Sequence, residues 1–272
     1  MIVPNQENIK VHFASAEQLP KTISTLAGGV KYGLGTAFPF VYKMFNNGKI
    51  DDRKLIKTIS SKYKHFILDS GLFTLMFGSL KGKKDEAYLD KWYECLTDYV
   101  LHEQYKGTMV EVDCQKVLGV EKAWEYRIKM QDKMPNRIIN VFHFEDGKKG
   151  LDRLIEFSDY IALSVPELRF IKKKQYLNKL ANYIKNKKPE IDIHLLGCTE
   201  KNLLKDLIFC TSADSTSWLS PLIYGYVDSK SIGYYKHFPN SVARNNKIYC
   251  GTEVFCVEYF LNIYNQYAGN QN

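Results

Sequence analysis

The chain alternates short β-rich runs with longer amphipathic stretches, and this alternation constrains its fold more than any other feature. The β-rich runs carry many β-branched residues and are bounded by polar residues or glycine, which favours strands over helices. They lie at residues 11–15, 65–69, 109–113, 138–143, 160–164, 191–197, 207–211 and, more weakly, 247–250. Helical periodicity is typical of residues 85–102, 120–134 and 175–187, and Pro189 ends the last of these helices.

Strands that are separated by helices form parallel βα units. About eight such units in 272 residues predict a (β/α)8 barrel that spans residues 1–272 as a single domain. A doubly wound open sheet is the alternative, but the chain has no GxGxxG motif or P-loop to support a nucleotide-binding version of it. We find no linker, internal repeat or low-complexity segment that would divide the chain.

Polar residues follow the predicted strands. In a barrel the carboxyl ends of the strands form the active face, so polar residues at those ends are expected to converge there. The residues are Asp69, Glu111, Asp113, His143, Ser164, Gly197 and Asp214. Because they come from six predicted strands, their convergence is a stronger indication of a functional site than any one motif.

Two of these residues, Asp69 and Asp214, suggest a specific chemistry. Each follows an apolar run and has a serine beside it, so its carboxylate can sit in a dry pocket and still reach a ligand. Two such carboxylates can supply the nucleophile and the acid/base of a double displacement at a sugar carbon. The alternative is structural: Asp214 would cap the next helix, and Asp69 would cap its strand end.

The formal charge of +8 favours an anionic partner. Lysines cluster at residues 81–84, 172–174 and 185–188, and such clusters suit the phosphates of a nucleic acid, although a solvated lysine-rich surface is the alternative. No apolar run approaches the roughly 18 residues of a membrane span. The first residues do not form a signal peptide, so we expect a cytoplasmic protein without a membrane segment.

The six cysteines form neither a CxxC pair nor a zinc-knuckle spacing. We expect free and mostly buried thiols in a reducing compartment, and neither a metal nor a cofactor. A metal shared by Cys250, Cys256 and a distant histidine stays open.

With these residues aligned, the chain resembles the tRNA-guanine transglycosylase superfamily over roughly residues 65–218. The Asp-Ser-Gly-x-Phe run at 69–73 is similar to the family's Asp-Ser-Gly-Gly-Phe, with Leu72 in place of the second glycine. The His-Leu-Leu-Gly run at 194–197 resembles the strand before the family's nucleophile, and Asp214 matches that nucleophile. The resemblance therefore implies that Asp214 is the nucleophile and Asp69 the acid/base.

The resemblance also implies a set of substrate-binding residues. Phe73 would stack on the base, one of Glu111 and Asp113 would accept hydrogen bonds from the purine, and Trp218 would support the Asp214 loop or stack on a nucleobase. The full set is Ser70, Gly71, Phe73, Glu111, Asp113, His143, Ser164, Gly197, Ser215 and Trp218. Structural alternatives stay open for several of them: a core position for Phe73 and His143, and a plain turn for Gly197.

Two departures from the tRNA enzymes point to one branch of the superfamily. The chain lacks the CxCxxC zinc motif with its later histidine, and it is much shorter than those enzymes. The Ser-Thr-Ser-Trp sequence after Asp214 is similar to the sequence pattern of the deoxypurine-in-DNA type A proteins, which occur in phages and bacterial modification clusters. That resemblance implies a DNA-guanine transglycosylase that exchanges guanine in DNA for a 7-deazaguanine such as 7-cyano-7-deazaguanine, with partner proteins of a modification system.

Three alternative functions stay open at this point. The same chemistry could act on tRNA, a nucleoside or glycoside hydrolase could use the same two carboxylates, or the barrel could bind nucleic acid without catalysis. Guanine release that depends on an added deazaguanine distinguishes base exchange from hydrolysis, and loss of function on replacing Asp69 or Asp214 distinguishes an enzyme from a binding protein.

Overall fold

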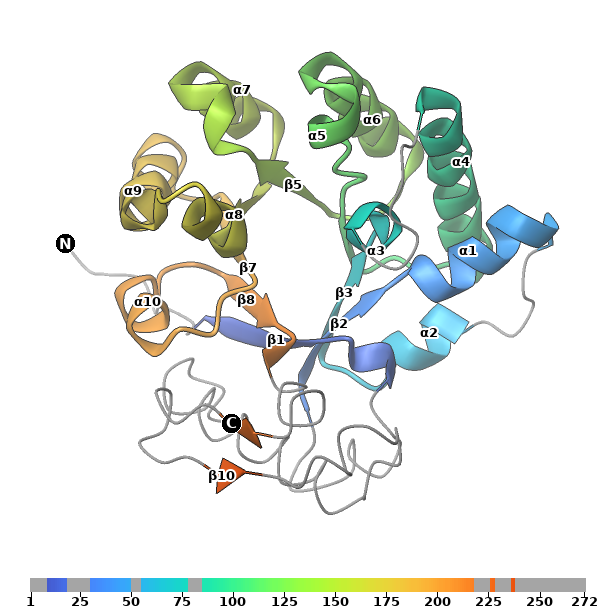
Figure 1. The fold of residues 1–272 in the computed structure, drawn as a ribbon, viewed down its shortest axis with the longest axis horizontal. Helices are drawn as coiled ribbons and strands as arrows, with labels where there is room; N and C mark the ends of the chain where they lie inside the picture. Colours follow the sequence, from blue (N-terminus) through green and yellow to red (C-terminus); the bar gives the residue numbers. More distant parts are fainter. Residues whose placement is uncertain are drawn as a thin grey trace. The chain divides into compact units, whose positions relative to one another are not determined.

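The computed structural model describes residues 9–18, 30–49, 55–77 and 85–217, together with 226–227 and 236–237. Eight strands pair in chain order into a closed barrel with helices between them, which confirms the predicted (β/α)8 fold (Figure 1). The strands are β1 Lys10–Ala14, β2 Tyr32–Thr36, β3 His65–Asp69, β4 Thr108–Val110, β5 Ile138–Phe142, β6 Tyr160–Ser164, β7 Asp192–Leu196 and β8 Ser212–Ser215. Two short strands, β9 Tyr226–Val227 and β10 Lys236–His237, pair antiparallel outside the barrel order.

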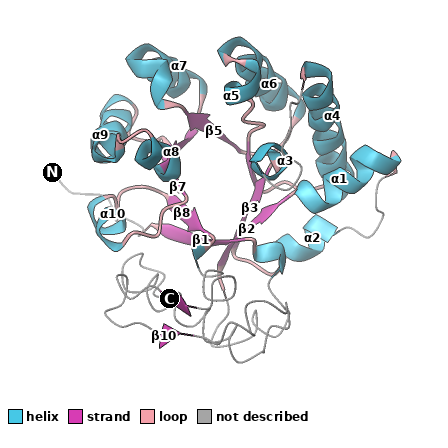
Figure 2. Cartoon of the chain, viewed as in Figure 1, coloured by secondary structure: helices cyan, strands magenta, loops and turns pink. Residues whose placement is uncertain are grey.

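Helices follow most of the barrel strands (Figure 2). They are α1 Phe38–Asn47, α2 Leu55–Ser60, α3 Leu72–Phe77, α4 Glu86–Glu103, α5 Gln115–Leu118, α6 Val120–Lys133, α7 Gly147–Phe157, α8 Val165–Phe170, α9 Leu177–Lys187 and α10 Lys201–Asp206. None of the helices in the described ranges combines the length and apolar character that crossing a bilayer requires.

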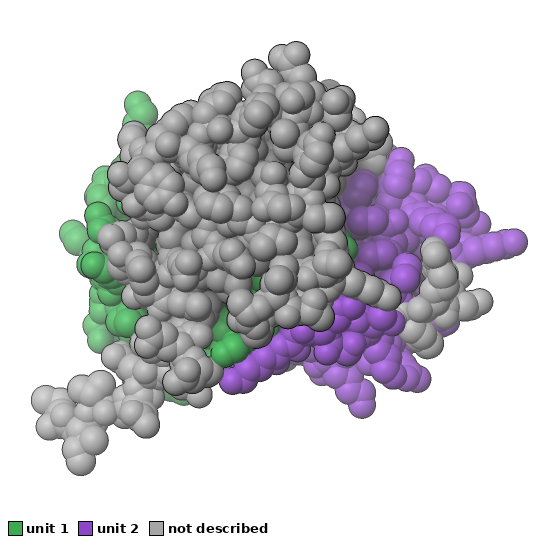
Figure 3. All heavy atoms as spheres, turned by 90° about the horizontal axis from the view of Figure 1, so that it is seen from below, with its two compact units in different colours: residues 1–32, 163–272 green, residues 33–162 purple. Residues whose placement is uncertain are grey.

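The chain divides into two compact units (Figure 3). Residues 1–32 and 163–272 form one, here called the terminal unit, and residues 33–162 form the other, the central unit. The single domain expected from the sequence stays a prediction.

The long helix α4 shows why the central unit folds as the sequence predicts. The Asp85 side chain accepts a hydrogen bond from the Tyr88 backbone N–H at 2.8 Å and so caps the helix at its start. Trp92 and Tyr99 on the same helix are fully buried, so its apolar face is part of the core. This helix begins and ends within one residue of the predicted range 85–102.

Most predicted strands are confirmed, with three differences. The run at 109–113 is strand only as far as Val110. Residues 207–211 are not a strand: Leu207, Ile208 and Phe209 form a turn after α10, and the strand β8 begins at Ser212. The strand β2 was not expected, and the predicted run 247–250 lies outside the described residues.

Candidate active site

A polar face on three neighbouring strands defines the candidate site of the terminal unit. In the parallel pairs β1–β8 and β7–β8, His12 lies beside Asp214 and His194 lies beside Ser212. Because side chains two residues apart share a face, these four side chains lie on one face of the sheet. Val11, Leu195 and Ala213 lie on the other face and are fully buried. Polar groups inside a buried sheet destabilise it unless they are hydrogen-bonded. The polar side chains on this face therefore need hydrogen-bond partners.

The Asp214 carboxylate is held through one of its two oxygens. Oδ1 accepts hydrogen bonds from His194 Nε2 at 3.1 Å and from the Gly197 backbone N–H at 3.0 Å. Among the residues that the structure describes, none donates a hydrogen bond to Oδ2. The side chain is 11% exposed. Asp214 therefore has a fixed orientation, little contact with solvent and one oxygen to which none of the described residues donates.

The tautomer of His194 follows from its two partners. A carboxylate only accepts hydrogen bonds, so the bond to Asp214 requires a proton on Nε2. In the neutral ring Nδ1 is then the acceptor, and the Ser212 hydroxyl donates to it. His12 lies next to this ring, with centroids 6.3 Å apart, and its Nδ1 is 3.3 Å from the Ala213 carbonyl oxygen. Ser212 therefore orients His194, and His194 orients Asp214.

Gly197 is required where it stands for two reasons. Its φ of +62° lies in the left-handed region, and a Cβ at this position would be 2.6 Å from Pro166 Cγ. The turn after β7 thus depends on glycine, and this turn directs the Gly197 N–H to Asp214. The predicted role as a turn is confirmed, and close approach to a base stays a prediction.

Two further predicted residues of the terminal unit have structural contacts. Ser215 Oγ lies 2.6 Å from Ser217 Oγ and accepts a hydrogen bond from the Ser217 N–H at 3.0 Å, so it shapes the segment after β8. Ser164 caps α8 by accepting from the Glu167 N–H at 3.2 Å. Substrate binding by both stays a prediction, and Trp218 lies outside the described residues.

In the central unit, Asp69 ends β3 in a tight turn. Its Oδ1 accepts from the Gly71 N–H at 2.8 Å, and its backbone carbonyl accepts from the Ala37 N–H at 2.9 Å. Gly71 has a φ of +78°, and a Cβ there would lie 2.8 Å from the Phe38 backbone N, so this position requires glycine. Ser70 is buried, and its carbonyl accepts from Trp92 Nε1 at 3.3 Å. The turn predicted as the structural role of these residues is therefore present, and the acid/base role of Asp69 stays a prediction.

Phe73, in the first turn of α3, is not a core residue. Its side chain is 73% exposed. The alternative in which Phe73 belongs to the core is therefore wrong. Stacking of this ring on a planar ligand stays a prediction.

Glu111 has a structural role that the sequence did not reveal. Its carboxylate accepts hydrogen bonds from Arg127 Nε at 2.7 Å, Arg127 Nη2 at 2.9 Å, Asn140 Nδ2 at 2.8 Å and the Val141 N–H at 2.8 Å. Both charged side chains are only 2% exposed. Burial lowers the pKa of the Arg127 guanidinium, but attraction to Glu111 and hydrogen bonding outweigh this, and the pKa is raised overall. Of the two acidic residues after β4, the contacts leave Asp113 as the one able to take a ligand.

Asp113 has a geometry that resembles that of Asp214. Its Oδ1 lies 2.8 Å from His143 Nε2, its side chain is 29% exposed, and none of the described residues donates to its Oδ2. His143 is buried and supports this carboxylate. The predicted alternatives for His143, a satisfied core histidine and a residue of the ligand site, are therefore compatible, since a buried histidine here orients an accessible carboxylate.

A polar cluster lies beside Asp113 in the sequence. Gln115 Nε2 donates to Asp146 at 2.7 Å, and Lys116 Nζ donates to Glu145 Oε2 at 2.6 Å. The hydrogen bond from Lys116 is the main cause that lowers the pKa of Glu145. These pairs are local links between α5 and the segment after β5.

Three residues were not singled out from the sequence: His12, His194 and Arg127. His12 and His194 alternate with apolar residues along their strands. That pattern predicts that they lie on the opposite face of the sheet from these apolar residues. Arg127 lies on the buried face of α6 with Ala123 and Met130, at helical spacing. A cation on an apolar stripe predicts a buried carboxylate partner, and Glu111 is that partner.

The described cysteines are free and buried, as expected, at Cys95, Cys114, Cys198 and Cys210. Burial raises the pKa of Cys114 and of Cys198 to about 12, so neither is a ready nucleophile. Within the described ranges no group of three or more histidine, cysteine or acidic side chains could hold a metal ion. Cys250 and Cys256 lie outside these ranges.

No protein-family model and no curated protein matches the chain. The resemblance to the transglycosylase superfamily therefore rests on the residues quoted above.

Proposed function

We propose that this protein is a base-exchange transglycosylase that replaces guanine in DNA with a 7-deazaguanine. The observation that carries the proposal is the Asp214 carboxylate, which is nearly buried and held through Oδ1 by His194 and Gly197, while Oδ2 has no partner among the described residues. A nucleophilic carboxylate must be ionised, oriented and able to approach an electrophilic carbon. The two hydrogen bonds to Oδ1 fix the orientation of the carboxylate and leave Oδ2 for attack.

The proposed reaction has two displacements. Asp214 Oδ2 attacks C1′ of the deoxyguanosine, the C1′–N9 bond breaks, and Asp69 gives its proton to the departing guanine. Asp69, now ionised, then takes the N9 proton of the incoming 7-deazaguanine. The deazaguanine N9 attacks C1′, the bond from C1′ to Asp214 breaks, and both carboxyl groups return to their starting states. Two inversions retain the configuration at C1′.

Base recognition is assigned to Asp113 and Phe73. A guanine presents an N1–H and an amino group along one edge, and a carboxylate is an acceptor for both. Asp113 is partly exposed and supported by His143, whereas Glu111 is already bound by Arg127. Phe73 supplies the exposed ring for stacking. Reaching C1′ in a duplex requires the target nucleotide to leave the base stack.

The positive charge supports a nucleic-acid substrate, but not every lysine in the clusters is available for it. Lys174 is paired with Glu200, and Lys185 donates to the carbonyls of Pro189 and Ile191. Lys172 and Lys187 are exposed on the same unit. Contacts to phosphates position a nucleic acid without reading its sequence, which is what such lysines can do.

The test is release of labelled guanine from DNA and, separately, from tRNA, with and without 7-cyano-7-deazaguanine. Asp214→Asn removes the nucleophile while keeping its shape, and Asp206→Asn, at the exposed end of α10, is the matched control. The proposal predicts that release of more than one guanine per protein from DNA requires both the deazaguanine and Asp214.

Other outcomes separate the alternatives. Release from tRNA alone would move the substrate to RNA, and release of more than one guanine per protein without an added base would indicate a hydrolase. No release by the wild-type protein, or equal release by Asp214→Asn, would contradict the proposed mechanism.

A further inference from the structure

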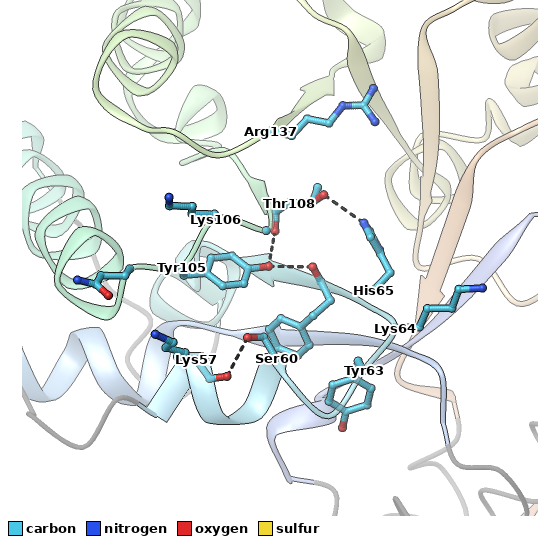
Figure 4. A pocket seen from close by; sticks show the side chains of 12 residues that line it. Lys57, Ser60, Tyr63, Lys64, His65, Tyr105, Lys106, Thr108 and Arg137 are labelled. Carbon is cyan, nitrogen blue, oxygen red and sulfur yellow. Dashed lines mark hydrogen bonds between the residues drawn. The ribbon is translucent and has the colours of Figure 1, made fainter.

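A basic hollow lies in the central unit at the amino ends of β3 and β4, with a volume of about 350 Å³ (Figure 4). His65 begins β3 on this side, whereas Asp69 ends the same strand. Four residue steps at about 3.3 Å each separate them by about 13 Å along the strand. The hollow is therefore distinct from the turn at Asp69, and its argument does not depend on the proposed function.

The lining is cationic. Lys57, Lys64, Lys106 and Arg137 contribute to it, together with His65, and no carboxylate of the described residues does. Arg137 Nε lies 3.4 Å from Asp159 Oδ2, but within the described part of the chain the three lysines have no ion-pair partner. Some described lysines outside the hollow are paired: Lys122 with Glu86, Asp90 and Glu125, Lys133 with Asp98, and Lys148 with Asp152. The hollow is thus lined by three lysines whose charges no described carboxylate neutralises.

Hydrogen bonds hold the residues at the base of the hollow in place. The Tyr105 hydroxyl lies 2.8 Å from the Phe66 carbonyl oxygen and 3.0 Å from the Thr108 carbonyl oxygen, and it joins the ends of β3 and β4. A Cβ at Gly107 would lie 2.2 Å from this hydroxyl, so glycine is needed there for the ring to fold back. Asn136 Nδ2 donates to the carbonyls of Tyr105 and Gly107 at 2.8 and 2.9 Å and fixes the same loop.

Neutral polar groups complete the lining. Thr108 supplies a hydroxyl and Gln104 an amide, whereas the Ser60 hydroxyl donates to the Lys57 carbonyl at 3.1 Å. Thr108 Oγ1 lies 3.2 Å from His65 Nε2, which orients both groups along one edge. Figure 4 shows Ser60, His65 and Thr108 around the hollow, with Arg137 and Lys64 on different sides of it. Hydroxyls, amides and ammonium groups around one space are the donors that a phosphate accepts from.

We propose that this hollow binds a small phosphorylated molecule of about nucleotide size, with Lys57, Lys64 and Lys106 contacting its phosphates. The volume falls within the range of about 300–1,000 Å³ that is typical of small-molecule sites. A nucleic-acid backbone, the other source of phosphate, binds along an extended basic strip, whereas the three lysines here line a single hollow. The observations therefore favour a small ligand.

The experiment titrates the full chain with adenosine 5′-diphosphate, inorganic pyrophosphate, adenosine and a single-stranded oligonucleotide by calorimetry. The test variant carries Lys57→Gln, Lys64→Gln and Lys106→Gln. The matched control carries Lys129→Gln, Lys149→Gln and Lys179→Gln, three exposed lysines outside the hollow with the same change in net charge. Thermal melting of both triple variants checks that the fold is kept.

The expected result is that the diphosphate and pyrophosphate bind the wild type and that adenosine does not. Three exposed charge contacts, each worth a factor of about two, predict binding about tenfold weaker in the test variant and unchanged binding in the control. Equal losses in both variants, equal binding of adenosine, or no binding of either phosphorylated probe would overturn the proposal. Lysine-dependent binding of the oligonucleotide alone would overturn it as well and would assign the hollow to a nucleic-acid backbone.

Discussion

Replacing Glu111 with glutamine should destabilise the protein strongly, because it leaves a buried charge without its partner. The Glu111 carboxylate receives four hydrogen bonds, two of them from Arg127, and both side chains are 2% exposed. Glutamine keeps the shape but turns one acceptor into a donor that faces a guanidinium N–H. The Arg127 charge then stays buried without compensation.

The magnitude follows from this geometry. Removing one partner of a buried ion pair costs about 3–5 kcal/mol. The total free energy of unfolding of a domain is about 5–15 kcal/mol, so Glu111→Gln should remove a large part of it. Arg127→Met should cost a similar amount, because it leaves the carboxylate buried and unpaired.

Urea denaturation followed by circular dichroism measures both changes as shifts in the midpoint. The double variant Glu111→Gln/Arg127→Met should lose less than the sum of the two single losses, since neither charge is then left alone. Glu94→Gln, on the exposed face of α4, is the matched control and should change the free energy of unfolding by less than about 0.5 kcal/mol. Additive losses, or a Glu111→Gln variant as stable as the control, would refute the reasoning that Glu111 is structural.

Two further predictions concern the glycine turns and the buried thiol. Gly197→Ala should lower the free energy of unfolding by more than Gly48→Ala does. Gly48 also has a positive φ, but a Cβ there would have no atom within 4 Å, so Gly48→Ala should cost about 1 kcal/mol. Equal losses of stability in thermal melts would exclude the clash between a Cβ at position 197 and Pro166. Burial raises the pKa of the Cys198 thiol from 9.0 to about 12. Its contribution to stability is therefore fully present below pH 9, where the unfolded thiol is also protonated, and is lost as the pH rises towards about 12. The urea midpoint should fall less steeply with pH across this range for Cys198→Ala than for the wild type. The same slope in both proteins would contradict a raised pKa of the Cys198 thiol.

The barrel was predictable because most of its strands are apolar and separated by periodic helices. The strand β2 was not, because its sequence Tyr-Gly-Leu-Gly-Thr contains two glycines, which are rare in strands. Buried Tyr32 and Leu34 and the pairing of the barrel outweigh that local preference.

The strand β8 was misplaced for the opposite reason. Residues 207–211 are largely apolar, but the Leu207 N–H bonds to the Leu203 carbonyl and the Cys210 N–H to the Leu207 carbonyl, so they finish α10 and its turn. The strand itself, Ser-Ala-Asp-Ser, has little strand propensity and is held by pairing with β1 and β7. Such pairing partners are distant in sequence, and no local pattern indicates them.

The candidate site shows the same division between local and distant information. Asp69 was predictable from the strand that it ends, whereas Asp214 lies within β8 rather than after the strand predicted at 207–211, and Asp113 lies three residues beyond the end of β4. The supporting residues were not predictable, because His194 reaches Asp214 across neighbouring strands and Arg127 reaches Glu111 from a helix. A sequence pattern indicates which face a residue occupies, but not which group it meets there.

The most direct test of the central claim is whether Asp214 forms a covalent bond to DNA. The protein is incubated with a guanine-containing oligonucleotide without added base, denatured, and studied by gel electrophoresis and intact-mass spectrometry. We expect a denaturation-stable protein–DNA adduct for the wild type and for Asp206→Asn, its absence for Asp214→Asn, and its disappearance when 7-cyano-7-deazaguanine is added. An adduct that persists in Asp214→Asn, or guanine exchange that proceeds without any adduct, would contradict the assignment of Asp214 as the nucleophile.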